Sequence, residues 1–179
     1  MFSKKAKKDG RKLDLSWLKQ ERQKMKNLIK PILFAGLVVG ILDGIDAIIA
    51  YKLVLGFDPV PIYQFVASGL LGQSAYLMGA TSFLIGVAVH FLVAFTASAF
   101  YFAAATKLAW LNQNAFLSGI VYGIGVWTFM NFVVTPLSQI PASPFNLALF
   151  INGVVGHALF VGLPISLIAR RVRARLRWR

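Results

Sequence analysis

Long apolar runs alternate with short polar or proline-containing segments along this chain of 179 residues. Four of the runs can cross a bilayer, because a helix rising about 1.5 Å per residue needs about 20 residues to span about 30 Å of hydrocarbon. The pattern predicts membrane-spanning helices at residues 31–55, 81–106, 115–134 and 146–169. Pro31 suits the first turn of the first span, where its missing N–H has no helical partner to lose.

The segments between the spans differ in kind. Residues 107–114 form a short turn, which makes the second and third spans antiparallel neighbours. Residues 135–144 contain three prolines, which oppose helix continuation and favour an extended path. Residues 57–79 are too apolar for a free loop and too interrupted by proline and glycine for a span. We expect a short helix there, lying on or dipping into the outer surface, where it can cap a cavity.

Composition agrees with this pattern. The chain is 58% hydrophobic and 14% charged, whereas soluble domains carry about 25% charged residues. We therefore expect an all-α, polytopic membrane protein with a bundle of four transmembrane helices. Its organisation is a basic N-terminal segment (1–30), a transmembrane domain (31–169) and a basic tail (170–179). Cysteine is absent from the sequence, which excludes disulfides, thiolate metal sites and cysteine nucleophiles.

Positive charge is concentrated at the two ends of the sequence. All of the 19 Lys and Arg residues except Lys52 and Lys107 lie within 1–30 or 170–179. Such an excess marks the cytoplasmic side of membrane proteins, so we expect both termini in the cytoplasm and a multi-pass protein of the bacterial inner membrane. Lys107 falls on the same side in this topology. Lys52 falls outside, at a helix end where its ammonium group can reach the interface.

The basic N-terminal segment also predicts a partner. Residues 13–30 form a helical pattern with Leu18, Met25 and Leu28 roughly on one side, typical of a surface helix on anionic lipid headgroups. The partners expected are therefore the bilayer and its anionic lipids. Nucleic acid is not expected, because the basic tails lack interleaved aromatic residues and a recognisable binding module.

Glycines at four-residue spacing indicate closely packed helices. Gly36, Gly40 and Gly44 follow this spacing on the first span, and Gly119 and Gly123 on the third. Small residues let helix backbones approach, which is how helices associate in lipid. Packing within one bundle is the favoured interpretation, and a homodimer through the glycine faces is the alternative.

Ionisable and amide side chains interrupt the apolar spans. Counting about 1.5 Å per residue from the predicted span ends places them at similar depths. The sequence thus predicts one polar layer, to which every span contributes: Asp43, Asp46, His90, Asn131, Asn152 and His157. On the second span, the predicted inward face carries Gly86, Ala94, Ala97 and Tyr101 beside His90.

Asp43 and Asp46 need partners at this depth, because an unpaired carboxylate inside a membrane costs several kcal/mol. His90 and His157 are the other ionisable groups of the layer. We expect an Asp–His hydrogen bond that favours the protonated imidazole and makes the pair a proton acceptor near neutral pH. The alternative is a structural role, in which the pair fixes the helix register.

Three functional hypotheses fit the layer: a metal site, a step in proton or cation transport, and a haem site. Asp43, Asp46, His90 and His157 can supply four ligands for a divalent metal such as zinc, manganese or iron. The layer can instead be the proton or cation step of a small transporter. A b-type haem between His90 and His157, with Gly86 and Gly153 making room, ranks below both.

Enzymatic activity is not favoured by the sequence. It contains no Gly-x-Ser-x-Gly elbow, Walker loop, His-Glu-x-x-His or dinucleotide fingerprint. A membrane-embedded metal hydrolase stays an alternative, and an assembly-partner role without a ligand is another. Absence of a cofactor is favoured over a divalent metal or haem b.

Three stretches carry a family resemblance: "HFLVAFTASAFY", "TPLSQIPASPFN" and "GHALFVGLPISLIARRVRAR". They resemble the corresponding parts of the YagU-like bacterial inner-membrane proteins over roughly the last hundred residues. The resemblance does not extend to "GILDGIDA" or to the basic N-terminus. It implies a polytopic inner-membrane protein and carries over His90, Tyr101, His157, Arg170 and Arg171, without assigning a role to any of them.

Overall fold

The computed structural model describes residues 16–108 and 110–177, and these residues form helices without strands. Four helical stretches are long and apolar enough to cross a membrane, which confirms the predicted all-α fold of a multi-pass membrane protein. The stretches are Lys26–Leu55, Ala80–Lys107, Ala115–Leu137 and Leu147–Ala174. The first fifteen residues, with part of the predicted surface helix, lie outside the described residues.

The first two spans are the regular helices α1 (Ser16–Leu55) and α3 (Ala80–Lys107). Each of the other two contains a π-helical turn. The third comprises α5 (Ala115–Phe129), the π turn η2 (Met130–Val134) and α6 (Thr135–Leu137). The fourth comprises α7 (Leu147–Gly156), the π turn η3 (His157–Gly162) and α8 (Leu163–Arg177). Shorter elements connect the spans: α2 (Pro59–Leu71), the 3₁₀ helix η1 (Gly72–Leu77) and α4 (Trp110–Gln113).

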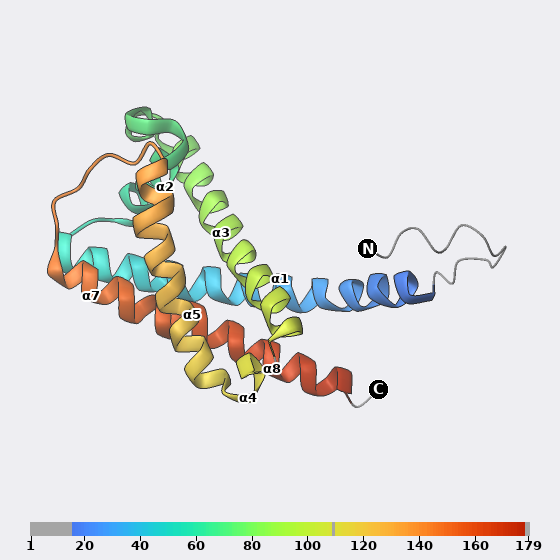
Figure 1. Ribbon diagram of the computed structural model, residues 1–179. Coiled ribbons are helices and arrows are strands. Elements are labelled where there is room, and N and C mark those ends of the chain that lie inside the picture. Colours follow the sequence, from blue (N-terminus) through green and yellow to red (C-terminus); the bar gives the residue numbers. More distant parts are fainter. Residues whose placement is uncertain (1–15, 109, 178–179) are drawn as a thin grey trace, which may run out of the picture.

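The start of α1 and the end of α8 lie at one end of the bundle, here named the terminal end (Figure 1). The opposite end is named the distal end. Helix α1 runs antiparallel to α7 and α8 and packs against them, while α3 packs on α1 and α5 packs on η3 and α8. Toward the distal end, α3 diverges from α1 (Figure 1).

Helix α1 corrects one expectation, because it begins at Ser16 and continues through Pro31. The predicted surface helix and the first span are therefore one helix over the described residues. Residues before and after the proline in the sequence pack inward, since Leu28 and Ile32 both contact the hydrophobic core. These contacts account for the continuity of the helix. They offset the hydrogen bond that a proline removes inside a helix. The side chains of Leu18 and Met25 lie outside the described part.

The third span also extends beyond its predicted end, to Leu137. The helix was expected to stop before Pro136, which instead lies in the last helical turn. In a regular helix the ring of Pro136 would clash with the carbonyl of Phe132, but Phe132 belongs to the wider π turn η2.

The hydrophobic core fills the bundle from its middle to the terminal end. It is built mostly from small and medium side chains of α1, α3 and α8: Ala35, Val39, Ala94, Ala97, Tyr101, Phe102, Ala105, Leu111, Val161, Ile165 and Ala169. The inward face predicted for α3 is confirmed, since Gly86, Ala94, Ala97 and Tyr101 are buried. Arg173 of α8 donates to the carbonyl oxygen of Ala105 at 2.7 Å, which joins the ends of α3 and α8.

Both glycine series serve contacts within the chain. Gly36 and Gly40 of α1 lie against the rings of Phe95 and Phe91 on α3. Gly119 and Gly123 of α5 lie against the backbone of η3 and α8, where Gly162 approaches them in turn. The glycines therefore act as predicted for close packing in one bundle.

At the distal end, α2 covers the bundle and packs mainly against α3. The buried Gln64 side chain donates to the carbonyl oxygen of Gly79 at 3.2 Å and lies 3.3 Å from the hydroxyl of Ser82. Gly86 contacts the backbone of Tyr63 directly, so the two helices touch without a side chain between them. The short helix predicted within 57–79 is confirmed.

The segment after α6 is tied to the end of α2. The backbone N–H of Gln139 donates to the carbonyl of Gly69 at 3.1 Å, and its side-chain amide donates to the carbonyl of Leu70 at 2.9 Å. These bonds satisfy carbonyls that the end of a helix otherwise leaves without partners. Residues distant in the sequence thus form one roof over the distal end.

Candidate functional site

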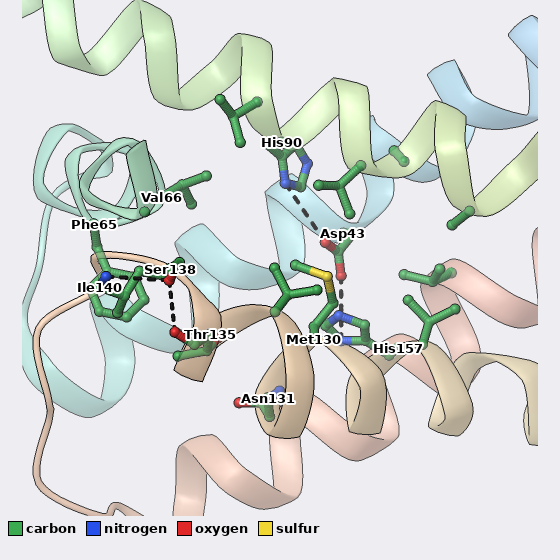
Figure 2. Close-up of a pocket in the computed structure, with 18 of the residues that line it drawn as sticks. Asp43, Phe65, Val66, His90, Met130, Asn131, Thr135, Ser138, Ile140 and His157 are labelled. Atoms are coloured by element: carbon green, nitrogen blue, oxygen red, sulfur yellow. Dashed lines mark hydrogen bonds and ion pairs between the residues drawn. The ribbon is translucent and has the colours of Figure 1, made fainter. Parts of the chain in front are cut away.

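Asp43 lies between two histidines inside the bundle (Figure 2). Its Oδ2 atom is 3.9 Å from Nδ1 of His90 on α3, and its Oδ1 atom is 3.8 Å from Nδ1 of His157 in η3. The Asp43, His90 and His157 side chains are 20%, 14% and 24% exposed. Three of the four spans therefore bring one ionisable side chain each to a partly accessible cluster, named here the Asp–His triad.

Hydrogen bonding fixes the tautomer of His90. Its Nε2 atom lies 2.8 Å from the carbonyl oxygen of Gly40 on α1. A carbonyl only accepts, so Nε2 carries the hydrogen and donates it. In a neutral imidazole the other nitrogen, Nδ1, then has a lone pair, and this is the atom that faces Asp43.

His157 has the opposite tautomer. Its Nδ1 atom lies 2.9 Å from the carbonyl oxygen of Gly153, one turn earlier in the same helix. Nδ1 therefore carries the hydrogen, and this N–H also lies on the side of Asp43. On the side of Asp43, the neutral His157 ring thus presents an N–H that is donated to Gly153, whereas the neutral His90 ring presents a lone pair.

The direct Asp–His hydrogen bond expected from the sequence is not formed. Distances of 3.8 and 3.9 Å exceed the range of a hydrogen bond. Each histidine instead bonds a backbone carbonyl of a glycine, where no side chain stands in the way. The gaps beside Asp43 leave room for a proton or a donor group.

The other predicted polar residues make their hydrogen bonds outside the triad. The carboxyl group of Asp46 accepts from the amide of Asn152 at 3.0 Å and lies against Gly156, so these residues join α1 to α7. Asn131 is exposed and donates to the carbonyl oxygen of Trp127 at 2.9 Å. The six residues of the predicted layer thus divide into a triad, a pair of Asp46 and Asn152, and Asn131, which lines the same cavity as the triad.

A cavity of about 320 Å³ adjoins the triad (Figure 2). Asp43, His90 and His157 line it together with largely apolar side chains of α2, α3, α5 and η2. The roof of the cavity consists of Phe65, Val66, Gly69 and Leu70 of α2 with Ser138 and Ile140. The short helix α2 thus caps a cavity, as expected from the sequence. It is held by the bonds between Gln139 and α2.

Sequence reasoning missed two features of the site. The first is the pair of π turns, which both line the cavity, η2 through Met130 and Val134 and η3 through His157 and Val161. Such turns occur frequently at functional sites, because the extra residue redirects side chains. A hydropathy pattern with a period of 3.6 residues does not contain a signal for them.

Tyr63 of α2 is the second missed feature. Its hydroxyl lies beside Gly44, and its ring packs edge-on against His90 with centroids 5.8 Å apart. Burial, and secondarily the negative charge of Asp43, raises the pKa of the Tyr63 phenol. The hydroxyl therefore stays protonated beside the triad.

The metal and haem hypotheses do not match this geometry. Within the described residues, no group of three or more His, Cys, Asp or Glu side chains is placed to hold a metal ion. The glycines expected to leave room for a macrocycle are covered, Gly86 by the backbone of Tyr63 and Gly153 by the indole of Trp127.

The candidate site is thus an Asp–His triad in the wall of a mostly apolar cavity. The YagU-like resemblance stays a prediction, and of the residues it carries over, His90 and His157 lie in the triad and Tyr101 in the core. No protein-family model, curated protein or solved structure matches this chain.

Proposed function

We propose that this multi-pass membrane protein binds a proton between Asp43 and His90 and exchanges it with the cavity, as the proton- or cation-binding step of a small transporter. The observation that carries the proposal is the orientation of His90. Because Nε2 donates to Gly40, the lone pair of Nδ1 faces the Asp43 carboxylate across 3.9 Å. Two electron-rich atoms facing each other repel, and one proton on either side removes the repulsion.

The membrane setting strengthens this preference. Neutral groups are favoured away from water, and a carboxylate there requires a compensating charge. A protonated His90 would compensate the charge of Asp43, whereas the Nδ1 hydrogen of His157 is already donated to Gly153. The partial exposure of all three side chains to the cavity gives the proton a route of entry.

The test is histidine nitrogen NMR of the purified full chain between about pH 5 and 9, where imidazole normally titrates. We expect one ring, assigned to His90 by its loss in His90→Gln, to gain a hydrogen on Nδ1 as the pH falls. Asp43→Asn keeps the shape of the side chain and should shift this titration. If neither histidine responds to Asp43→Asn, the triad has a structural role, and the proton proposal is wrong.

A structural role for Asp43 is the alternative, and the pair formed by Asp46 and Asn152 shows how a carboxyl group can join two spans. Asp43→Leu distinguishes the roles. On the structural alternative, Asp43→Asn should be nearly silent and Asp43→Leu should cost about 1–3 kcal/mol of unfolding free energy. On the proton-binding proposal, Asp43→Asn should preserve stability and shift the titration of His90.

We also infer that the terminal end faces the cytoplasm of a bacterial cell and that the protein resides in the inner membrane. The basis is the placement of basic residues, nearly all of which lie in the two sequence ends. At the distal end, Lys52 is paired with Asp58 at 2.7 Å, so it adds no net charge there. Reporter fusions at both termini should be cytoplasmic, and a fusion within 138–146 should face the other side; a terminus found outside would contradict the inference.

A further inference from the structure

The walls of the cavity are unsuited to a bare inorganic cation. Away from the triad, aliphatic side chains dominate the lining: Val66, Leu70, Val89, Val93, Val126, Val134, Ile140 and Val161. Of the polar lining residues, Asn131 donates to its own helix and Ser138 bonds the turn that contains Thr135 and Ile140. Hard cations require several oxygen ligands, and one carboxylate with two imidazoles supplies too few.

The size and polarity of the cavity fit a small organic molecule. About 320 Å³ lies at the lower end of the volumes of ligand sites, which combine apolar walls with a few polar groups that fix orientation. Here the ionisable groups are at one place, the triad. An occupant that matches both parts has an apolar body and one polar head.

The charge of the triad determines which polar group of a ligand fits beside it. With its proton, the pair of Asp43 and His90 is neutral, and without it the carboxylate and the Nδ1 lone pair of His90 are acceptors without a donor between them. An alkylammonium group supplies several N–H donors and one positive charge. It can bridge Asp43 and His90 across the 3.9 Å gap that is too long for a direct bond.

We propose that the cavity binds a lipophilic amine, with its ammonium group at Asp43 and His90 and its apolar body between α3 and α5, in exchange for the proton of the triad. The proposal rests on the proton-binding function and names its substrate class. The exchange is balanced: the proton leaves to water as the ammonium enters, so the charge of the occupied site stays constant.

Other titratable groups near the triad do not provide an alternative exchange. On α1, Asp46 accepts from Asn152 and is not among the residues that line the cavity, and on α2, Tyr63 stays protonated and does not line it either. The elements α5 and η2 face the cavity with Val126, Met130, Asn131 and Val134, which do not titrate. Proton release on amine binding is therefore assigned to the triad.

The experiment compares octylamine, octanol and octanoate, added to the full chain in nanodiscs of neutral lipid in a weakly buffered solution. Empty nanodiscs give the contribution of lipid partitioning. We expect saturable octylamine binding with release of about one proton, and an affinity that rises about tenfold per pH unit while the triad is protonated. Octanol should release none. Proton uptake with octanoate in place of release with octylamine would overturn the choice of an amine.

Two matched variants locate the binding. Val93→Phe fills the cavity without changing the triad, whereas Leu92→Phe enlarges a neighbouring side chain that is 63% exposed. Val93→Phe should lower octylamine affinity at least tenfold and keep the histidine titration, and Leu92→Phe should leave both unchanged. Binding unaffected by Val93→Phe would overturn the cavity proposal.

The titration of the ligand-free protein separates this proposal from the one on which it rests. If His90 titrates together with Asp43 but octylamine releases no proton, the amine proposal is wrong and proton binding stands. If His90 does not titrate with Asp43, both are wrong. Asp43→Asn should abolish proton release, and Asp58→Asn, at an exposed carboxylate, should preserve it.

Discussion

The terminal and distal halves of the bundle are packed differently. In the terminal half the spans meet directly, and Tyr101 and Ile165 are at most 1% exposed. In the distal half the space between the spans is occupied by a cavity under α2. The difference suggests a division of roles. The packed terminal half keeps the helices that carry the triad in place, and the distal half contains the cavity that the triad lines. Substitutions in each half can test this division of roles.

The largest effect is expected where backbone meets backbone. A Cβ atom on Gly162 would overlap the backbone of Gly119 and Gly123, which cannot move without separating the fourth span from the third. Gly162→Val should therefore lower the unfolding free energy by about 3 kcal/mol or more, since overpacking a core costs about 1–3 kcal/mol even where side chains can adjust. Thermal unfolding in detergent measures this loss.

The matched control is Gly125→Ala on α5, where an added Cβ has no neighbour within 4 Å. Alanine is the better helix former, so this variant should be at least as stable as the parent. Equal losses for Gly162→Val and Gly125→Ala would show that the close contact does not hold the terminal half together.

The next effect is expected at the contact between α2 and α3. A Cβ on Gly86 would overlap the carbonyl of Tyr63, so Gly86→Ala should displace α2 at a cost of about 2 kcal/mol. Because the core of the terminal half is built from other residues, it should stay folded. Hydrogen exchange should accelerate in α2 and stay slow near Tyr101. Uniform acceleration throughout the chain would contradict a separate role for the two halves.

A smaller effect is expected at the roof of the cavity. Gln139→Ala removes the side-chain bond to Leu70 but keeps the backbone bond to Gly69, so it should cost about 1 kcal/mol. Exchange should increase at the end of α2. Gln113→Ala, at an exposed position near the terminal end, is the control and should be neutral.

The smallest effect is expected at the exposed pair of Lys52 and Asp58. Their side chains are 55% and 75% exposed, and such pairs contribute about 0–1 kcal/mol. A double-mutant cycle with Lys52→Gln and Asp58→Asn should give a coupling at the low end of this range that disappears in high salt. A coupling above about 1 kcal/mol that resists salt would indicate that the pair fixes the entry to α2.

The spans were predictable from the sequence because a bilayer imposes a length and an apolar composition that can be counted. The capping helix was also predictable, since its prolines and glycines exclude a span and its apolar residues exclude a free loop. Pro31 misled the prediction of α1, because contacts of Leu28 and Ile32 with the core are not visible in the local sequence.

The site was only partly predictable. Depth counting brought Asp43, His90 and His157 together, and these three do form the triad. It could not separate Asp46 or Asn131 from them, because depth gives no direction around the helix. The two π turns change that direction by adding a residue to a turn. The directions in which side chains near His157 point could therefore be obtained only from the structure.

The bond between Gln139 and Leu70 also constrains the order in which the protein can mature. Its partners are 69 residues apart, and His157 belongs to the fourth span, which is synthesised after the other three. Asp43 thus enters the membrane before the segment after the third span can complete the roof and before the fourth span can supply the second imidazole. Non-local contacts of this kind form late. A nascent chain that stalls after two spans therefore contains neither the complete triad nor the complete roof of the cavity, so the site can form only once all four spans have been synthesised.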